Sequence, residues 1–133
     1  MLGASRVMAS IPVSDVEQAR GFYEGSLELR VVHSDLADGS IEYECGNGTQ
    51  LFTYPTPSAG KSPATQAAWQ VDDVEETARM LKDAGVVLEE YNFPGLKTID
   101  GIATLSSETV TAKAAWFKDP DGNILNVFER PFV

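Results

Sequence analysis

The sequence predicts an α+β fold of two paired βαβββ modules, whose sheets join into a curved mixed sheet around a concave cavity. Three observations lead to this prediction. Residues 13–17 (VSDVE) recur 58 positions later as residues 71–75 (VDDVE), with four of five positions identical. Each copy follows a strand-like segment and opens an amphipathic helix. After each helix the pattern changes to that of three strands bounded by turn residues.

In the first module, the opening strand is expected at residues 6–12. Ser14 and Glu17 have the spacing of a capping box and therefore predict the start of a helix. Gly25 suits the end of this helix. Three strands follow, and Asn47-Gly48 between the last two predicts a two-residue hairpin turn. The helix stripe and the strands comprise Val16, Ala19, Phe22 and Tyr23, and residues 28–33, 40–45 and 49–54.

The second module repeats this order, beginning with a strand at residues 64–71. Asp72 and Glu75 have the capping-box spacing, and Gly85 suits the helix end. Asp121-Gly122 predicts the last turn. The apolar stripe of the helix and the later strands comprise Val74, Ala78 and Leu81, and residues 86–91, 112–118 and 123–129.

We expect one domain over residues 1–133, because neither module of about 60 residues would bury enough core alone. Module one spans about 5–54, a Pro- and Ser-rich linker spans 55–63, and module two spans about 64–130. Residues 92–111 are predicted to form a long loop with three large apolar side chains. We expect this loop to cover the cavity mouth or to contact a second subunit. These side chains are Phe93, Leu96 and Ile99.

Composition excludes several classes of function. The chain has 10 Lys and Arg against 20 Asp and Glu, a net charge of −10, which argues against nucleic acid and anionic membrane surfaces as partners. Cys45 is the only cysteine, which fits a reducing cytosol. No apolar run approaches the roughly 20 residues of a membrane span. Residues 1–6 lack the features of a signal peptide, so a soluble, cytoplasmic protein is expected.

The end of the chain carries the most specific motif. Residues 114–125 combine an aromatic strand, the turn Asp-Pro-Asp-Gly-Asn at 119–123 and an apolar strand. Together with the helix openings at 13–17 and 71–75, this ending resembles the vicinal oxygen chelate superfamily. That group includes glyoxalase I, extradiol dioxygenases, fosfomycin-resistance enzymes, methylmalonyl-CoA epimerases and bleomycin-resistance binding proteins. The resemblance covers the whole chain and implies the same paired βαβββ fold.

The resemblance also implies where the four metal ligands of metal-dependent members would lie. Counting from the helix-opening aspartates gives Met8 and Gln66, and counting from the turn glycines gives Asn126 and Phe52, or Leu51 after a one-residue slip. None of these supplies a carboxylate, imidazole or thiolate, the donors that divalent metals need. We therefore expect no metal and no other cofactor.

The same positions predict an aromatic cavity with amide anchors, because alternate residues of a strand share one face. In fosfomycin-resistance relatives an aromatic residue at the position of Trp116 contacts the ligand, and Tyr43 is a further candidate here. Such a cavity would orient a small organic molecule by stacking and a few hydrogen bonds. The predicted cavity residues are Met8, Ser10, Phe52, Tyr54, Gln66, Ala68, Trp116 and Asn126.

The orientation of Glu42 and Glu44 depends on the hairpin register. If Phe52 faces the cavity, a two-residue turn places Tyr43 across from it and the glutamates point away. If Leu51 faces the cavity, the glutamates point inward, where they could act as acid and base. The first register is favoured. His33, the only histidine, is expected to be exposed or hydrogen-bonded rather than catalytic.

Two functions follow from these residues. The first is a metal-free small-molecule-binding protein of the bleomycin-resistance kind. The second is a lyase or isomerase of the glyoxalase class, with displaced metal ligands or with carboxylate acid–base catalysis. Because relatives often pair, a homodimer is expected.

Overall fold

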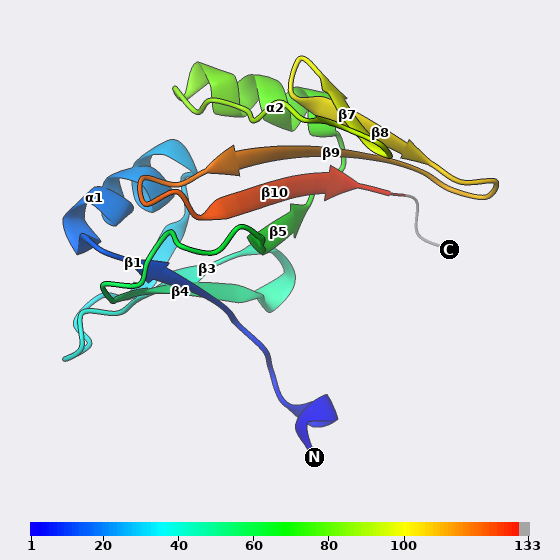
Figure 1. Cartoon of the computed structure of the whole chain (residues 1–133). Helices are drawn as coiled ribbons and strands as arrows, with labels where there is room; N and C mark the ends of the chain where they lie inside the picture. Colours follow the sequence, from blue (N-terminus) through cyan, green and yellow to red (C-terminus); the bar gives the residue numbers. More distant parts are fainter. Residues whose placement is uncertain (131–133) are drawn as a thin grey trace. The chain divides into compact units, whose positions relative to one another are not determined.

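The computed structural model describes residues 1–130, and the chain forms two compact units within it (Figure 1). The first comprises Met1–Ser62 and the short segment Pro120–Asn123. The second comprises Pro63–Asp119 and the chain from Ile124 onward. Each unit contains one sheet, and each is described by itself below.

The first unit contains a four-stranded sheet in the order β1-β4-β3-β2. β1 pairs with β4 in parallel, and the other neighbours are antiparallel. Short 3-10 turns occur at η1 (Leu2–Ala4) and η3 (Gly46–Gly48), and a π-helix, η2 (Gly21–Ser26), continues the first helix. The remaining elements are β1 (Ala9–Val13), α1 (Val16–Arg20), β2 (Arg30–His33), β3 (Ile41–Glu44) and β4 (Gln50–Pro55).

The core of the first unit lies between one face of this sheet and the α1–η2 helix. Alternate strand residues point to this face, as the period of two requires. Tyr23 of η2 stacks on Tyr43 of β3, with ring centroids 6.1 Å apart. The buried apolar residues are Ile11, Val13, Ala19, Tyr23, Ile41, Tyr43 and Leu51.

Tyr43 also joins a polar network at the edge of this core. Its hydroxyl donates to Glu24 Oε2 at 2.9 Å, and Arg20 Nε lies 2.7 Å from the same oxygen. The hydrogen bond from Arg20 lowers the pKa of Glu24, and the bond from Tyr43 lowers it further. Burial, with the neighbouring Glu24 charge, raises the pKa of the Tyr43 phenol. The network therefore gives a buried hydroxyl a charged partner.

Both α-helices begin one residue later than the predicted capping boxes. Asp15 is the N-cap of α1 and accepts from Gln18 N at 3.1 Å. Asp73 is the N-cap of the helix of the second unit, α2 (Val74–Asp83), and accepts from Glu76 N at 3.1 Å. The prediction of Ser14 and Asp72 as caps was wrong. An aspartate one position on offers the same short carboxylate to the N3 amide.

Ser14 is held instead by the turn that the Asp-Pro-Asp-Gly-Asn motif forms. Asp121 accepts hydrogen bonds from the Ser14 amide, at 3.0 Å, and from the Ser14 hydroxyl. Asn123, only 1% exposed, donates to the Pro12 carbonyl at 2.7 Å and accepts from Gly60 N at 3.2 Å. The motif therefore fastens the end of β1 to the segment after β4, all inside the first unit.

The β3–β4 hairpin has one more loop residue than predicted. Cys45 N donates to Thr49 O at 2.8 Å, so three residues, Gly46–Gly48, form the loop rather than Asn47-Gly48 alone. Asn47 and Gly48 both have positive φ. The extra residue shifts the register by one, so that Tyr43 pairs with Leu51 and not with Phe52.

The second unit contains a sheet in the order β5-β10-β9-β8-β7-β6. β5 and β10 are parallel, and the other neighbours are antiparallel. Its elements are β5 (Thr65–Gln70), α2 (Val74–Asp83), β6 (Asn92–Phe93), β7 (Leu96–Ile99), β8 (Ile102–Ser106), β9 (Thr111–Lys118) and β10 (Ile124–Glu129).

Helix α2 packs along β8, β9 and β10 (Figure 1). The predicted apolar stripe is confirmed, because its three residues are all buried. Gly85 has the expected positive φ after the helix, whereas Gly25 does not and lies inside η2. The buried apolar residues of this unit are Val74, Ala78, Leu81, Val86, Leu88, Ala103, Ala114, Ala115, Phe117, Leu125 and Val127.

The predicted loop at residues 92–111 was wrong, because this segment contains the whole of β6, β7 and β8. The strand predicted at residues 86–91 was also wrong, and β8 is the strand that pairs with β9 opposite β10. Those residues contribute only one bridge, between Leu88 and Phe117. Polar residues interrupt the apolar alternation of β7 and β8, so their strand pattern was weak in the sequence. Among residues 1–130 no helix is long and apolar enough to span a membrane.

Candidate functional site

The first sheet has a helix-free face, the one opposite α1, which carries half of the predicted cavity residues. Ser10 of β1 pairs with Phe52 of β4, so the two side chains share this face, and Tyr54 follows two residues later. The Phe52 and Tyr54 rings lie 5.9 Å apart at 48° and are both half-buried. Met8 is exposed directly before β1.

The shifted hairpin register decides which other residues share the helix-free face of the first sheet. Glu42 pairs with Phe52, so the carboxylate stands beside the aromatic ring rather than pointing away from it. Tyr43 and Leu51, by contrast, are buried on the helix side. Tyr43 was therefore wrong as a cavity candidate, and so was the prediction that Phe52 and the glutamates point to opposite faces.

The acidic groups on this face differ in their partners. Glu44 forms an ion pair with Arg30, with Oε2 and Nε 2.8 Å apart. Among residues 1–130, His33 is the only basic residue within ion-pair distance of Glu42, with Nε2 and Oε2 4.0 Å apart. The Glu42 side chain is 26% exposed and that of His33 is 58% exposed. The expectation of an exposed His33 is confirmed, although it lies beside a carboxylate.

The second sheet also has a helix-free face, opposite α2. Asn126 of β10 pairs with Ala68 of β5 on one side and with Trp116 of β9 on the other, so these three predicted residues share it. Asn126 is 7% exposed, and its amide nitrogen donates to the Ala115 carbonyl at 3.3 Å. Gln66 lies at a register shift between β5 and β10, and its amide nitrogen donates to Ala64 O at 3.1 Å.

An aromatic cluster around Trp116 was missed by the sequence reasoning. The Tyr91 ring packs edge-on against Trp116 at 5.6 Å and stacks on Phe93 at 5.7 Å. Burial, with the nearby Glu89 charge, raises the pKa of the Tyr91 phenol. Glu89 donates its backbone N–H to Trp116 O at 2.8 Å, which positions Tyr91 beside β9. The sequence signal for this cluster was the aromatic pair Tyr91 and Phe93. It was overlooked because Tyr91 was assigned to the predicted strand at 86–91 and Phe93 to the predicted loop at 92–111.

The four positions that the family's metal ligands would occupy do not fit a divalent metal ion. Met8 offers a thioether, Phe52 a hydrocarbon ring, and Gln66 and Asn126 neutral amides whose nitrogens already donate to carbonyls. Mg²⁺, Zn²⁺ and Fe²⁺ sites in proteins are built from carboxylates, imidazoles or thiolates. Within residues 1–130, no three His, Cys, Asp or Glu side chains are grouped so that they could hold a metal ion.

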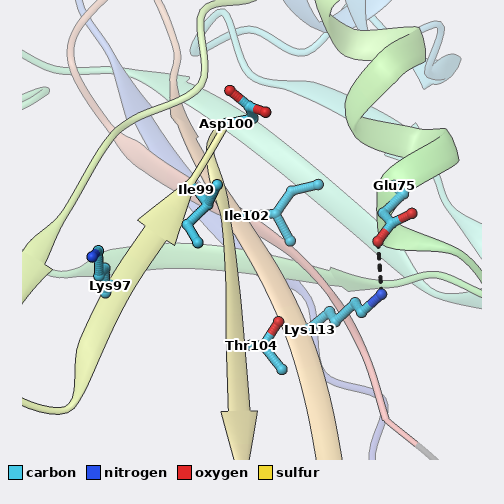
Figure 2. A pocket seen from close by; sticks show the side chains of 7 residues that line it. All are labelled: Glu75, Lys97, Ile99, Asp100, Ile102, Thr104 and Lys113. Atoms are coloured by element: carbon cyan, nitrogen blue, oxygen red, sulfur yellow. Dashed lines mark hydrogen bonds and ion pairs between the residues drawn. The ribbon is translucent and has the colours of Figure 1, made fainter.

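A shallow depression of about 590 Å³ lies on the α2 side of the second sheet. Figure 2 shows Glu75 of α2 and Lys113 of β9 pointing toward each other at one edge, with Nζ and Oε1 2.7 Å apart. Ile99 and Ile102 line it between this ion pair and Lys97 (Figure 2). None of the predicted cavity residues lines this depression, because they lie on the helix-free faces.

Comparisons with solved structures give full-length matches. An antibiotic-binding protein from Streptomyces sp. CB03234, TnmS3, matches with a TM-score of 0.69 and 22% identity, over 98% of this chain and 99% of that one. A glyoxalase/bleomycin resistance protein from the same organism matches with 0.64 and 23%, over 92% and 98%. A lactoylglutathione lyase from Agrobacterium tumefaciens matches with 0.67 and 15%, over 95% and 93%. These likenesses establish the fold.

A search of curated proteins gives no significant match. The family comparison is decisive, because the sequence profile of one superfamily matches residues 5–127, nearly the whole chain. The chain belongs to the Glyoxalase/Bleomycin resistance protein/Dioxygenase superfamily.

Proposed function

We propose that this chain is a small-molecule-binding protein of the bleomycin-resistance kind, which holds an organic ligand without a metal ion. One feature carries the proposal: the positions that the sequence assigns to the family's metal ligands hold Met8, Phe52, Gln66 and Asn126, none of which is a carboxylate, imidazole or thiolate. Phe52, Trp116 and Asn126 lie on the helix-free faces of their sheets. Such residues orient a ligand by stacking and by a few hydrogen bonds.

This fold is found in enzymes and in binding proteins alike. One protein with the same fold is described as an antibiotic-binding protein, and this description supports binding as the function. The negative charge of −10 would attract a cationic molecule and repel an anion, and it would leave a neutral molecule unaffected. The proposal therefore covers neutral and cationic organic molecules with an aromatic part.

The test is a binding screen by calorimetry or nuclear magnetic resonance with a panel of aromatic small molecules, including antibiotics, with and without chelator. We expect saturable binding that chelator leaves unchanged. Phe52→Leu should weaken it. Ile99→Ala is the control. Ile99 is also an exposed apolar residue, and it lines the depression on the α2 side of the second sheet, so its loss should leave binding unchanged. Failure of every member of the panel to bind would overturn the proposal.

A second candidate function is a lyase or isomerase of the glyoxalase class that uses carboxylate acid–base catalysis. The observation that favours it is the placement of Glu42 beside Phe52, with His33 Nε2 4.0 Å from the carboxylate. A carboxylate on this face could take a proton from a bound substrate, and the neighbouring imidazole could return one to it. Turnover of a hemithioacetal, lost in Glu42→Gln and independent of added nickel or zinc, would support this candidate.

We also propose that the protein acts as a homodimer in the cytoplasm. The single cysteine, Cys45, supports a reducing compartment. Light scattering should give twice the chain mass of 14.4 kDa, and a value equal to one chain would refute the dimer.

A further inference from the structure

The helix-free face of the first sheet places a carboxylate directly beside an aromatic pair. Phe52 is the Cα partner of Glu42 on β3 and of Ser10 on β1, so the three residues form one row across three strands. Tyr54 packs against Phe52 at 5.9 Å. Together with Tyr54, the row therefore places a hydroxyl group, two aromatic rings and one carboxylate on the same side of the sheet.

The charge of Glu42 has no strong counter-ion among the described residues. Arg30, the nearest arginine in the sheet register, pairs with Glu44 at 2.8 Å and is directed to that residue. Glu42 meets only the imidazole of His33, at 4.0 Å. The Glu42 side chain is 26% exposed, and among residues 1–130 no lysine or arginine forms an ion pair with it, so its carboxylate can attract a cation.

Phe52 and Tyr54 favour the same ligand charge as Glu42. An aromatic ring presents a negative face, which attracts an ammonium or guanidinium group placed over it. The rings also bury apolar surface of a ligand, which removes water and strengthens the attraction to the carboxylate. Both features therefore select a cation that carries an apolar or aromatic group.

We infer that Glu42 is a specificity residue, which selects organic ammonium or amidinium ligands bearing an aromatic ring. This inference rests on the proposed function, since it names the class of molecule that the same face binds. The ring stacks on Phe52 and Tyr54, and the cationic nitrogen donates hydrogen bonds to the Glu42 carboxylate. Glu44 has no such role, because Arg30 already neutralises it.

The experiment compares three probes of the same shape: naphthylmethylamine, its neutral alcohol and the corresponding carboxylate. Binding is followed by nuclear magnetic resonance titration, which detects millimolar affinity. We expect the amine to bind on the order of tenfold more tightly than the alcohol, and the carboxylate to bind most weakly. Glu42→Gln should abolish the preference for the amine, and added salt should reduce it.

Glu44→Gln is the matched control, since it removes a glutamate two residues away on the same strand. It should keep the preference of the unmodified protein, and circular dichroism checks that both variants fold. Equal affinity for amine and alcohol, or a preference that survives Glu42→Gln, overturns the inference while leaving the proposed function standing. If none of the three probes binds to the unmodified protein, the inference about Glu42 is refuted, whereas the proposed function is decided by the wider panel of aromatic molecules.

Discussion

Replacing Gly60 by alanine tests whether the Asp-Pro-Asp-Gly-Asn turn fastens the first unit. Gly60 has φ +74°, and an added Cβ would lie 1.9 Å from the Asp121 carbonyl oxygen. Gly48 provides a matched control, because it has the same φ of +74° and no atom within 4 Å of its added Cβ. Both variants carry the same backbone penalty, and only Gly60→Ala adds a steric clash.

The magnitude follows from these contacts. A left-handed backbone costs alanine about 1–2 kcal/mol, which both variants lose. To relieve the clash, the Gly60 segment and the turn must separate by about 1 Å, since Cβ atoms essentially never approach within 3.0 Å. This separation weakens the bond from Gly60 N to Asn123 and strains the bond from Asn123 to Pro12. Each is worth about 1 kcal/mol, so Gly60→Ala should lose about 2 kcal/mol more than Gly48→Ala.

The assay is urea unfolding followed by circular dichroism. Tryptophan fluorescence is unsuitable, because Trp69 and Trp116 both lie in the second unit. A difference of 2 kcal/mol corresponds to roughly 5–10 °C in Tm for a chain of this size. Equal free energies of unfolding for Gly60→Ala and Gly48→Ala would show that the turn does not clamp this segment, and would refute the reasoning.

Three further predictions use other parts of the molecule. Because the pKa of Glu24 is lowered in the folded state, its ion pair stabilises the protein above the ordinary pKa of 4.5 and is lost as the pH falls through the lowered value. Glu24→Gln should therefore cost about 1 kcal/mol at pH 7, with a gap that closes in acid, and a gap independent of pH would contradict this. Gly101→Ala should destabilise the protein more than Gly95→Ala in thermal unfolding, since only at Gly101 would the added Cβ meet a side chain, that of Leu88 at 2.6 Å. Chelator should leave ligand affinity unchanged in calorimetry, and restoration of lost affinity by one divalent metal would show that metal ligands lie elsewhere in the chain.

Much of the fold was predictable because its signals are local. The repeat at residues 13–17 and 71–75 marks two helix starts, and the structure confirms a helix at each. The exact caps were missed by one residue, since Ser14 and Asp15 are both good capping residues and only the surroundings choose between them. The motif at 119–123 was recognisable from residue types alone, although its partners are not local.

The candidate site was predicted less completely, because it depends on which residues face each other across strands. Ser10 and Phe52 were correctly assigned to one face, since alternation within a strand is local. Tyr91 was missed because its contact with Trp116 joins segments that are distant in the sequence. β7 was missed because Leu96-Lys97-Thr98-Ile99 pairs with β8 without a clear alternation.

The sequence by itself determined the family and the two strand–helix units, because these depend on residue identity and short spacing. Only the tertiary structure decided that Glu42 stands beside Phe52. A single extra loop residue at Gly46–Gly48 shifts the strand register by one. Since side chains alternate with a period of two, this shift moves Glu42 to the opposite face relative to the predicted pairing.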